Sequence, residues 1–364
     1  MFSDQTYMRR CLALAKTALG KTAPNPLVGS VIVKQGQVVG EGFHPRAGQP
    51  HAEIFALRQA GKQAQGSTLY VNLEPCNHQG RTPPCTEAIS PAGIKTVVVG
   101  LVDPNPLVAG KGIERLRQAG ITVRVWVEEE ACQQLNEAFC FRIKHQRPFG
   151  IFKYAMTLDG KIATDQGHSA WITSPIARGW VHQLRSECQA VIVGGNTMRR
   201  DNPQLTSHGV SDHNPLRVVL SRSLDLPLQA QLWEQREAKT LVVTEKKGDQ
   251  NIQLQLDKLG VEVLVLEKLT PIAVMNELYR RECLQVLWEC GGILAAPAIA
   301  QGCVQKIHGF IAPKIIGGQY APSPVGNLGF TQMTEALMLK NLHCQSIGSD
   351  WLFTGYLNDG DDSD

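Results

Sequence analysis

The sequence has 364 residues, of which 43% are hydrophobic and 19% are charged, and its formal net charge is +3. This is the composition of a globular protein, and the length suits two domains of about 150 residues each. The small net charge argues against a surface that coats nucleic acid. It favours a small phosphorylated partner held by local basic residues.

The chain carries no sign of export or membrane insertion. No basic segment followed by an apolar core opens it, and no apolar run approaches the roughly 20 residues that span a bilayer. The ten cysteines are spread from Cys11 to Cys344, as expected of reduced thiols in a cytoplasm. We therefore expect a cytoplasmic protein without a membrane partner.

Helices and strands alternate along the first 146 residues. In chain order the pattern predicts a helix at 4–19, a hairpin at 28–39, a helix at 51–60, strands at 68–72 and 96–101, a helix at 111–119, a strand at 121–127 and a helix at 128–144. Such alternation predicts a largely parallel sheet with helices on both faces.

The helical pattern stops at Pro148, and the alternation then starts again. The second series of predicted strands is 149–156, 190–193, 217–220, 240–244, 261–266 and 285–289. No repeat relates the two halves. We therefore predict two different fused domains, at 1–146 and 147–357, followed by a disordered acidic tail at 358–364.

A metal site is predicted in the first half. His51-Ala-Glu53 opens a predicted helix, and Cys76 and Cys85 follow a predicted strand. One histidine and two cysteines suit zinc, and three protein ligands leave the fourth tetrahedral position for water. Glu53 lies two residues from His51, where it can carry protons without binding the metal. A hydrolytic deaminase needs such a group twice, for the water and for the leaving ammonia.

The alternative is a structural zinc site, for which His78 would be the fourth ligand. His-x-Glu followed by Pro-Cys favours the deaminase, and His78 is then a substrate contact. Nucleoside and nucleic-acid deaminases space their cysteines as Cys-x-x-Cys. Here eight residues, including Arg81, separate Cys76 from Cys85. The longer loop and its cation suit a substrate with a phosphorylated arm.

These motifs resemble one family closely. Pro24-Asn25-Pro26, His51-Ala-Glu53 and the segment from Pro75 to Cys85 are similar to the bifunctional deaminase-reductases of riboflavin biosynthesis. The resemblance implies a cytidine-deaminase-like α/β/α domain that acts on diaminohydroxyphosphoribosylaminopyrimidine. It also implies that Asn25 orients the ring and that His78 and Arg81 lie near the substrate. A plain turn between two prolines is the alternative for Asn25.

The second half has no Gly-x-Gly-x-x-Gly fingerprint. It does have Gly291-Gly292 after a buried strand and Gly194-Gly195 after another. Glycines at a strand-to-helix turn let an anion approach the free N–H groups of the helix, although a tight turn without a ligand has the same pattern.

The resemblance extends to this half, through the segments 153–161, 169–174 and 200–206 and through Glu289 with Gly291-Gly292. It implies a dihydrofolate-reductase-like α/β domain that uses NADPH to reduce the ribosyl group to ribityl. The implied NADPH contacts are Ala155, Trp171, Thr197, Asp201, Ser221, Gly291, Gly292, Ile293, Leu294, Ala295, Ala296 and Pro297. The implied substrate contacts are Lys153, Ser169, Arg185, Leu205, His208 and Glu289. Lys153 and Asp201 are the candidates to protonate the sugar.

Two departures from the family pattern concern the reductase. The family has arginine where this chain has His208, and it places glutamate directly before the glycine pair, where Cys290 intervenes here. A histidine is only partly charged near neutral pH. One alternative is therefore a deaminase whose second domain binds substrate but is catalytically impaired. Others are a nucleic-acid deaminase and a non-catalytic zinc-stabilised scaffold. From base rates and the resemblance we expect a homodimer or higher homo-oligomer.

Overall fold

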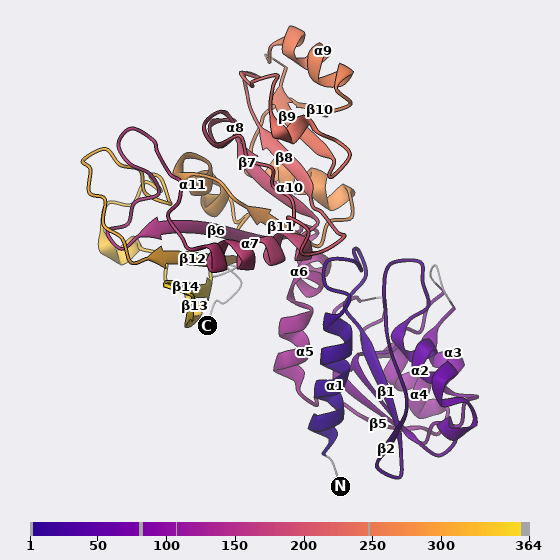
Figure 1. The fold of residues 1–364 in the computed structure, drawn as a ribbon. Helices are drawn as coiled ribbons and strands as arrows, with labels where there is room; N and C mark the ends of the chain where they lie inside the picture. The colour runs from indigo at the N-terminus through magenta and orange to yellow at the C-terminus, as the bar shows by residue number, and fades with distance from the viewer. Residues whose placement is uncertain (1–2, 80–82, 107, 247, 358–364) are drawn as a thin grey trace. The chain divides into compact units, whose positions relative to one another are not determined.

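The structure is a computed structural model, and it describes residues 3–79, 83–106, 108–246 and 248–357. It divides into two compact units, Met1–Gln146 and Arg147–Asp364, which Figure 1 shows in successive colours. Within the described ranges, no helix has both the length and the apolar character needed to cross a membrane.

The first unit is built on a five-stranded sheet with the order β2-β1-β3-β4-β5. The strands are β1 (Gly29–Lys34), β2 (Gln37–Phe43), β3 (Thr68–Leu73), β4 (Thr96–Leu101) and β5 (Thr122–Arg124). The last three strands are parallel, whereas β1 pairs antiparallel with β2 and β3. The sheet is thus mixed, because the predicted hairpin occupies one edge.

Helices cover both faces of this sheet (Figure 1). They are α1 (Asp4–Lys16), α2 (Ala52–Ala60), α3 (Cys85–Ile89), α4 (Lys111–Gln118), α5 (Glu129–Leu135) and α6 (Glu137–His145). Two strand glycines allow the helices to pack closely. A Cβ at Gly29 would lie 2.1 Å from the Cys11 carbonyl oxygen of α1, and one at Gly42 would lie 2.4 Å from the Phe55 Cβ of α2.

The predicted helix at 128–144 is two helices, because the chain leaves helical geometry at Asn136. The Asn136 side chain accepts a hydrogen bond from the Leu27 backbone N–H at 2.8 Å and donates one to the Leu27 carbonyl at 3.0 Å. This buried amide ties the helix pair to the segment before β1. A long-range contact of this kind leaves no periodicity in the sequence.

The second unit is built on a nine-stranded sheet with the order β10-β9-β8-β7-β11-β6-β12-β14-β13. The strands are β6 (Phe149–Thr157), β7 (Ala190–Gly194), β8 (Leu216–Leu220), β9 (Thr240–Glu245), β10 (Glu262–Leu266), β11 (Gln285–Trp288), β12 (Lys306–Ala312), β13 (Lys340–Ile347) and β14 (Asp350–Tyr356). All pair in parallel except β14, which runs antiparallel to both of its neighbours.

Helices pack on both faces of this sheet as well. They are α7 (Pro175–Glu187), α8 (Gly195–Asp201), α9 (Gln250–Lys258), α10 (Pro271–Arg280) and α11 (Gly292–Ala300). On β12, Ile307 belongs to the core beneath α10 and α11, whereas Phe310 packs against α7. Residues an odd number apart on a strand face opposite sides. The two faces of the sheet therefore carry separate clusters.

Three strands, β12, β13 and β14, are absent from the sequence-based prediction. In β12 the apolar run is interrupted by His308 and Gly309, and β13 is exposed at every residue except Ile347. An exposed edge strand lacks the alternation that identifies a half-buried one. Only pairing across the sheet defines these elements.

Candidate metal centre and reductase site

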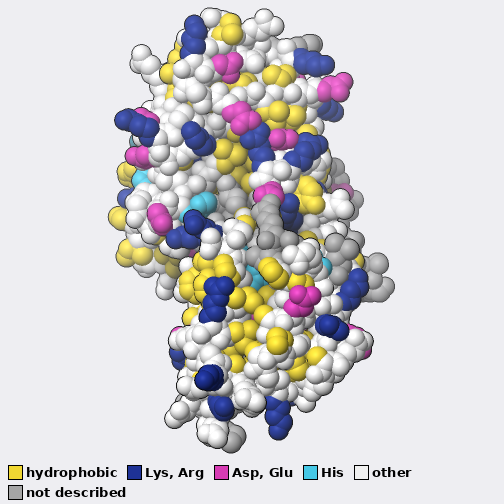
Figure 2. Space-filling view, turned by 90° about the vertical axis from the view of Figure 1, so that its right-hand side faces the viewer, with side chains coloured by type: hydrophobic (Ala, Val, Ile, Leu, Met, Phe, Trp, Pro, Cys, Tyr) yellow, Lys and Arg dark blue, Asp and Glu magenta, His cyan; other side chains and the backbone are white. Residues whose placement is uncertain are grey.

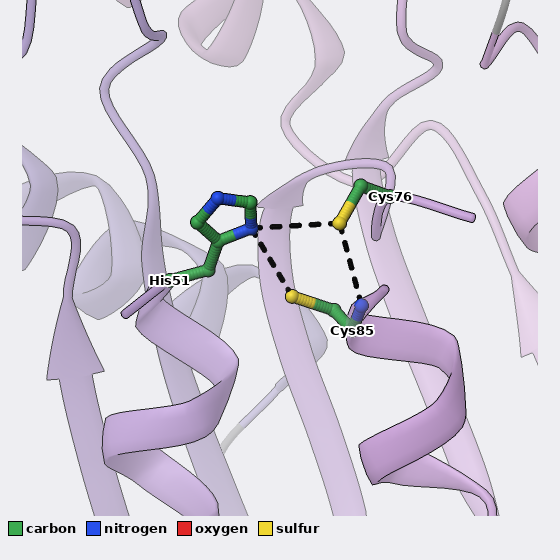
Figure 3. Close-up of side chains that lie close together, drawn as sticks. All are labelled: His51, Cys76 and Cys85. Atoms are coloured by element: carbon green, nitrogen blue, oxygen red, sulfur yellow. Dashed lines mark hydrogen bonds between the residues drawn. The ribbon is translucent and has the colours of Figure 1, made fainter. Parts of the chain in front are cut away.

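The three predicted metal ligands come together in the first unit. His51 precedes α2, Cys76 follows β3 and Cys85 begins α3, and their ligand atoms all lie within 4.8 Å of one another. The His51 Nδ1 atom is 3.5 Å from the Cys76 Sγ and 3.3 Å from the Cys85 Sγ (Figure 3). Ligands of a tetrahedral zinc ion are roughly 3.5 Å apart. The donor set and its spacing therefore fit zinc.

Within the described residues, this group of three is the only one of its kind, and exposed His78 is not part of it. The hydrogen bond between the two thiols lowers the pKa of Cys76. The Cys85 backbone N–H also donates to the Cys76 Sγ at 3.3 Å. Thiolate is the form of cysteine that binds metal. Three ligands and no fourth match a catalytic site better than a structural one.

Glu53 lies in the first turn of α2, the helix that follows His51, and it is almost fully buried. Its Oε2 atom has no hydrogen-bond partner in the described structure. Burial is the main cause that raises the pKa of Glu53 to about 6, with the Cys76 sulfur adding to it. A buried carboxyl group with a free oxygen and a pKa near neutrality suits proton transfer.

Asn25 lies beside a histidine that the sequence analysis did not single out. The Asn25 Nδ2 atom is 3.0 Å from the Nε2 of His44, whose Nδ1 is 3.1 Å from the Pro50 carbonyl oxygen. The His44 ring also meets the His51 ring edge-on, with centroids 5.3 Å apart. Burial lowers the pKa of His44, so the ring is neutral and accepts from Asn25. The sequence signal that could have identified His44 is its position directly after the strand β2.

Glu74 is a second residue that the sequence analysis missed. It directly follows β3, two residues before Cys76, and its carboxylate accepts four backbone hydrogen bonds from the segment that leads into and begins α4. The donors are Asp103 at 3.2 Å, Gly110 at 2.9 Å, Gly112 at 2.9 Å and Ile113 at 3.1 Å. A carboxylate at a helix N-terminus satisfies N–H groups that have no partner within the helix. Arg81 lies outside the described residues.

The predicted reductase residues gather at one edge of the nine-stranded sheet. Strands β6, β11, β7 and β8 are parallel neighbours, so their carboxyl ends meet at that edge. Ligands of open parallel sheets bind at this edge. On or after these strands lie Lys153 and Ala155 of β6, Thr197 and Asp201 of α8, Ser221 after β8, and Glu289 with Gly291 after β11.

An ion-pair cluster lies at the centre of this edge. The Arg185 Nε and Nη2 atoms donate to the two Glu289 oxygens at 2.5 and 3.0 Å, and Arg185 Nη1 donates to the Thr206 carbonyl at 3.2 Å. The Lys153 Nζ is 3.9 Å from Glu289. Burial raises the pKa of Glu289, but the Arg185 and Lys153 charges outweigh it and hold that pKa below its ordinary value. In the absence of a ligand, the Arg185 guanidinium is thus paired with Glu289 and the Thr206 carbonyl.

The turn from β11 into α11 offers room for a cofactor. A Cβ at Gly291 would meet only Ile162, at 4.0 Å, whereas one at Gly292 would lie 2.7 Å from the Gly326 backbone nitrogen. Gly291 therefore leaves space, and Gly292 is required by packing. Leu294 and Ala295 donate to the Gly291 carbonyl, so the amides of Gly292 and Ile293 are the first N–H groups of α11, which have no acceptor within the helix.

The other predicted contacts differ in accessibility. Ala295, Ala296 and Leu205 are buried. Ile293 and Trp171 are exposed, and the Arg178 guanidinium lies 4.5 Å from the centroid of the Trp171 ring. The Ser169 hydroxyl donates to Asp201 at 3.3 Å. Pro297 lies inside α11.

Basic side chains do not form a continuous tract on the molecular face in Figure 2, where Lys and Arg are interspersed with acidic and polar groups. Nucleic-acid-binding domains instead carry a basic stripe with stacking aromatic residues. The face in view therefore gives no support to a nucleic-acid deaminase.

Comparison with known proteins matches each half of the chain to a domain family. Residues 1–101 match the cytidine and deoxycytidylate deaminase zinc-binding region, and residues 148–353 match the RibD C-terminal domain. A riboflavin biosynthesis protein RibD from Synechocystis is 77% identical, with 100% of this chain and 99% of that protein covered.

Solved structures agree with this assignment over the full length. RibD from Acinetobacter baumannii, form 1, has a TM-score of 0.88 at 40% identity, with 98% of this chain and 99% of that chain covered. A diaminohydroxyphosphoribosylaminopyrimidine deaminase/5-amino-6-(5-phosphoribosylamino)uracil reductase from Thermotoga maritima has a TM-score of 0.86 at 37% identity, with the same coverage. The chain belongs to the RibD family, and it is a bifunctional deaminase and reductase of riboflavin biosynthesis that uses zinc and NADPH.

Proposed function

We propose that the first unit, residues 1–146, deaminates 2,5-diamino-6-ribosylamino-4(3H)-pyrimidinone 5′-phosphate, with zinc held by His51, Cys76 and Cys85. The observation that carries this assignment is the convergence of these three ligand atoms within 4.8 Å, beside a buried carboxyl oxygen of Glu53 that has no partner in the described structure. Zinc bound there makes a water molecule nucleophilic near neutral pH.

In this proposal Glu53 carries the protons. Its carboxylate takes a proton from the water and passes it to the ring, and it then takes the proton of the added hydroxyl and delivers it to the amino group, which leaves as ammonia. Asn25, held by His44, faces the pyrimidine and orients it. His78 and Arg81 are proposed substrate contacts on the longer loop between the two cysteines.

The second unit, residues 147–357, then reduces the ribosyl group of the deaminated product to ribityl. NADPH bound in this unit would supply the hydride for C1′ of the opened sugar. The Gly291–Pro297 turn, Thr197, Ser221 and Trp171 are the proposed contacts for the cofactor. Lys153 is the proposed proton donor to the sugar, because burial lowers its pKa while Glu289, 3.9 Å away, holds the ammonium in place. Asp201 hydrogen-bonds Ser169 at the rim and orients it.

We also propose that the protein is cytoplasmic and forms a homodimer or higher oligomer through β13. This strand ends the nine-stranded sheet and is exposed at nearly every residue, and Met338 beside it is 77% exposed. An unpaired edge with apolar side chains invites pairing with a second copy. A monomer in light scattering at micromolar concentration would contradict this part.

The two activities are tested in sequence. Zinc-loaded protein is incubated with the diaminopyrimidine ribotide while ammonia is measured, and NADPH is then added while its absorbance is followed. We expect ammonia first and NADPH oxidation second. Glu53→Gln should retain zinc but lose ammonia release by about 10²-fold or more, whereas Glu87→Gln, an exposed acid on α3, should not. Full activity in Glu53→Gln would refute the proton-carrier role.

A further inference from the structure

The loop that carries Trp171 is tied at both ends to a single lysine. This loop, residues 158–171, lies between β6 and α7. At its start the Leu158 backbone N–H donates to the Lys314 carbonyl at 2.8 Å, and at its end the Lys314 ammonium donates to the Trp171 carbonyl at 2.6 Å. Lys314 follows β12, which is the parallel neighbour of β6, so it lies at the same edge of the sheet. One residue of a neighbouring segment thus closes the whole loop.

The Asp159 carboxylate fixes the start of the loop to the residues that follow Lys314. It accepts from the Thr157 hydroxyl at 2.6 Å and from the backbone N–H groups of Gly317 at 2.8 Å and Ile316 at 3.3 Å. These hydrogen bonds, and that from Thr157 most of all, hold the pKa of Asp159 below its ordinary value. The carboxylate is therefore charged at neutral pH, and hydrogen bonds to a charged acceptor are stronger than those between neutral groups.

The segment 313–326, which contains Lys314, also reaches the turn after β11. Further along this segment, the Tyr320 backbone N–H donates to the Oδ1 atom of Asp165 in the loop at 3.0 Å. At its end, the Gly326 backbone N–H donates to the Gly292 carbonyl at 3.1 Å. The segment therefore joins the loop to the turn at which NADPH is proposed to bind.

The Trp171 side chain has little packing to hold it. The residue is 69% exposed, and it lines a cavity of about 360 Å³ together with Arg178 and Lys314. Its ring contacts the Arg178 guanidinium, but a cation–π contact at an exposed site is weak. A side chain with so little packing takes its position from its backbone, and the Trp171 backbone is held by Lys314.

We propose that Lys314 is a positioning residue that holds Trp171 where it contacts NADPH, with Asp159 as the second anchor of the loop. This inference rests on the proposed contact between Trp171 and NADPH. Lys314 acts through Trp171, because its ammonium is engaged by the Trp171 carbonyl. It restricts the conformations of the loop before the cofactor binds, so it raises the affinity for NADPH without changing the hydride-transfer step.

The test measures the dissociation constant of NADPH for the full-length, zinc-loaded protein. Lys314→Met removes the ammonium group and should raise this constant about tenfold, whereas Lys314→Arg keeps a donor and should raise it less than about threefold. Asp159→Asn should act in the same direction, because its amide keeps only one acceptor oxygen. At saturating NADPH, kcat of Lys314→Met should stay within about twofold of the wild type. Lys258→Met, exposed at the end of α9, is the matched control and should leave the constant unchanged.

The comparison that separates positioning from a general structural effect uses a Trp171→Ala background. Because Lys314 acts through Trp171, Lys314→Met should weaken NADPH binding there by less than about twofold. A tenfold loss in both backgrounds would overturn the proposal, as would an unchanged constant in Lys314→Met alone. An unchanged constant in Trp171→Ala would instead refute the proposed contact of Trp171 with NADPH, and this inference with it.

A measurement on the wild type does not depend on the variants folding. NADPH should slow amide hydrogen exchange in peptides that cover residues 313–320 as well as in those that cover 158–171, although the proposed contact lies in the second set alone. Protection of 158–171 without protection of 313–320 would also overturn the proposal. Protection of neither would refute the proposed Trp171 contact.

Discussion

Replacing Glu74 by glutamine changes one oxygen atom beside the metal centre and should loosen the segment that leads into α4. In the wild type, one carboxylate oxygen accepts from Gly112 and Ile113 and the other from Asp103 and Gly110. A glutamine amide keeps one acceptor oxygen. Its NH₂ group must then face two backbone N–H donors that have lost their partner.

The expected size follows from these contacts. A hydrogen bond to a charged group contributes about 1.5–3 kcal/mol, so losing two of them costs about 3–6 kcal/mol. Taking the lower value, because water can relieve part of the loss, the local opening free energy falls by about 3 kcal/mol, which corresponds to roughly 100-fold faster amide exchange. Hydrogen exchange of peptides that cover residues 103–113 measures this directly, without requiring the whole two-unit chain to unfold in a single transition.

Glu114→Gln is the matched control, because this acid is exposed on α4 and contacts only Gln118 among the side chains of the described residues. It should leave exchange in the 103–113 segment unchanged. If Glu74→Gln also left exchange there within about threefold of the wild type, the four hydrogen bonds would not be what holds the segment.

We further expect Glu74→Gln to weaken zinc affinity, because Cys76 lies two residues from Glu74 in the same segment between β3 and α3.

Three further substitutions follow from burial and close packing. Burial lowers the pKa of His308 to about 3. As the pH falls below about 6.5, this histidine is therefore protonated in the unfolded chain but not in the folded protein, which favours unfolding. At about pH 4.5 the wild type should have lost about 2–3 kcal/mol of stability that His308→Gln does not lose. Equal losses in urea unfolding would contradict this. Gly42→Ala should lower the melting temperature of the first unit and its zinc affinity, because a Cβ there overlaps Phe55 of α2. Gly179 lies in α7, where an added Cβ would have nothing within 4 Å. Gly179→Ala should therefore stabilise the protein by up to about 1 kcal/mol. Destabilisation by this substitution would show that the helix is packed more closely there than the structure indicates.

The candidate metal ligands could be proposed from the sequence because such a site depends on residue types at short spacings. His51 and Glu53 are two residues apart at a helix start, and Cys76 and Cys85 bracket one loop. Ligand identity, the open fourth position and a nearby proton carrier can all be inferred from such a pattern. The alternation of helices and strands likewise predicted both sheets, since buried parallel strands have strong local signals.

Tertiary structure alone decided the features that join distant segments. The split of the helix at Asn136 depends on Leu27, more than 100 residues earlier, and the edge strand β13 is exposed along nearly its whole length. In the reductase half, the fold pairs Arg185 with Glu289, although the two residues lie 104 positions apart in the sequence.

The sequence also did not predict that the His208 ring stacks on that of His182, with ring centroids 4.1 Å apart. The two residues come into contact only because α7 and the loop after α8 pack together. Local spacing determines which residues can act as ligands, since neighbours along the chain are held close by covalent geometry. Which charges remain unpaired depends on contacts between segments far apart in sequence. Those contacts are set by packing of the whole sheet, and no window of sequence contains them.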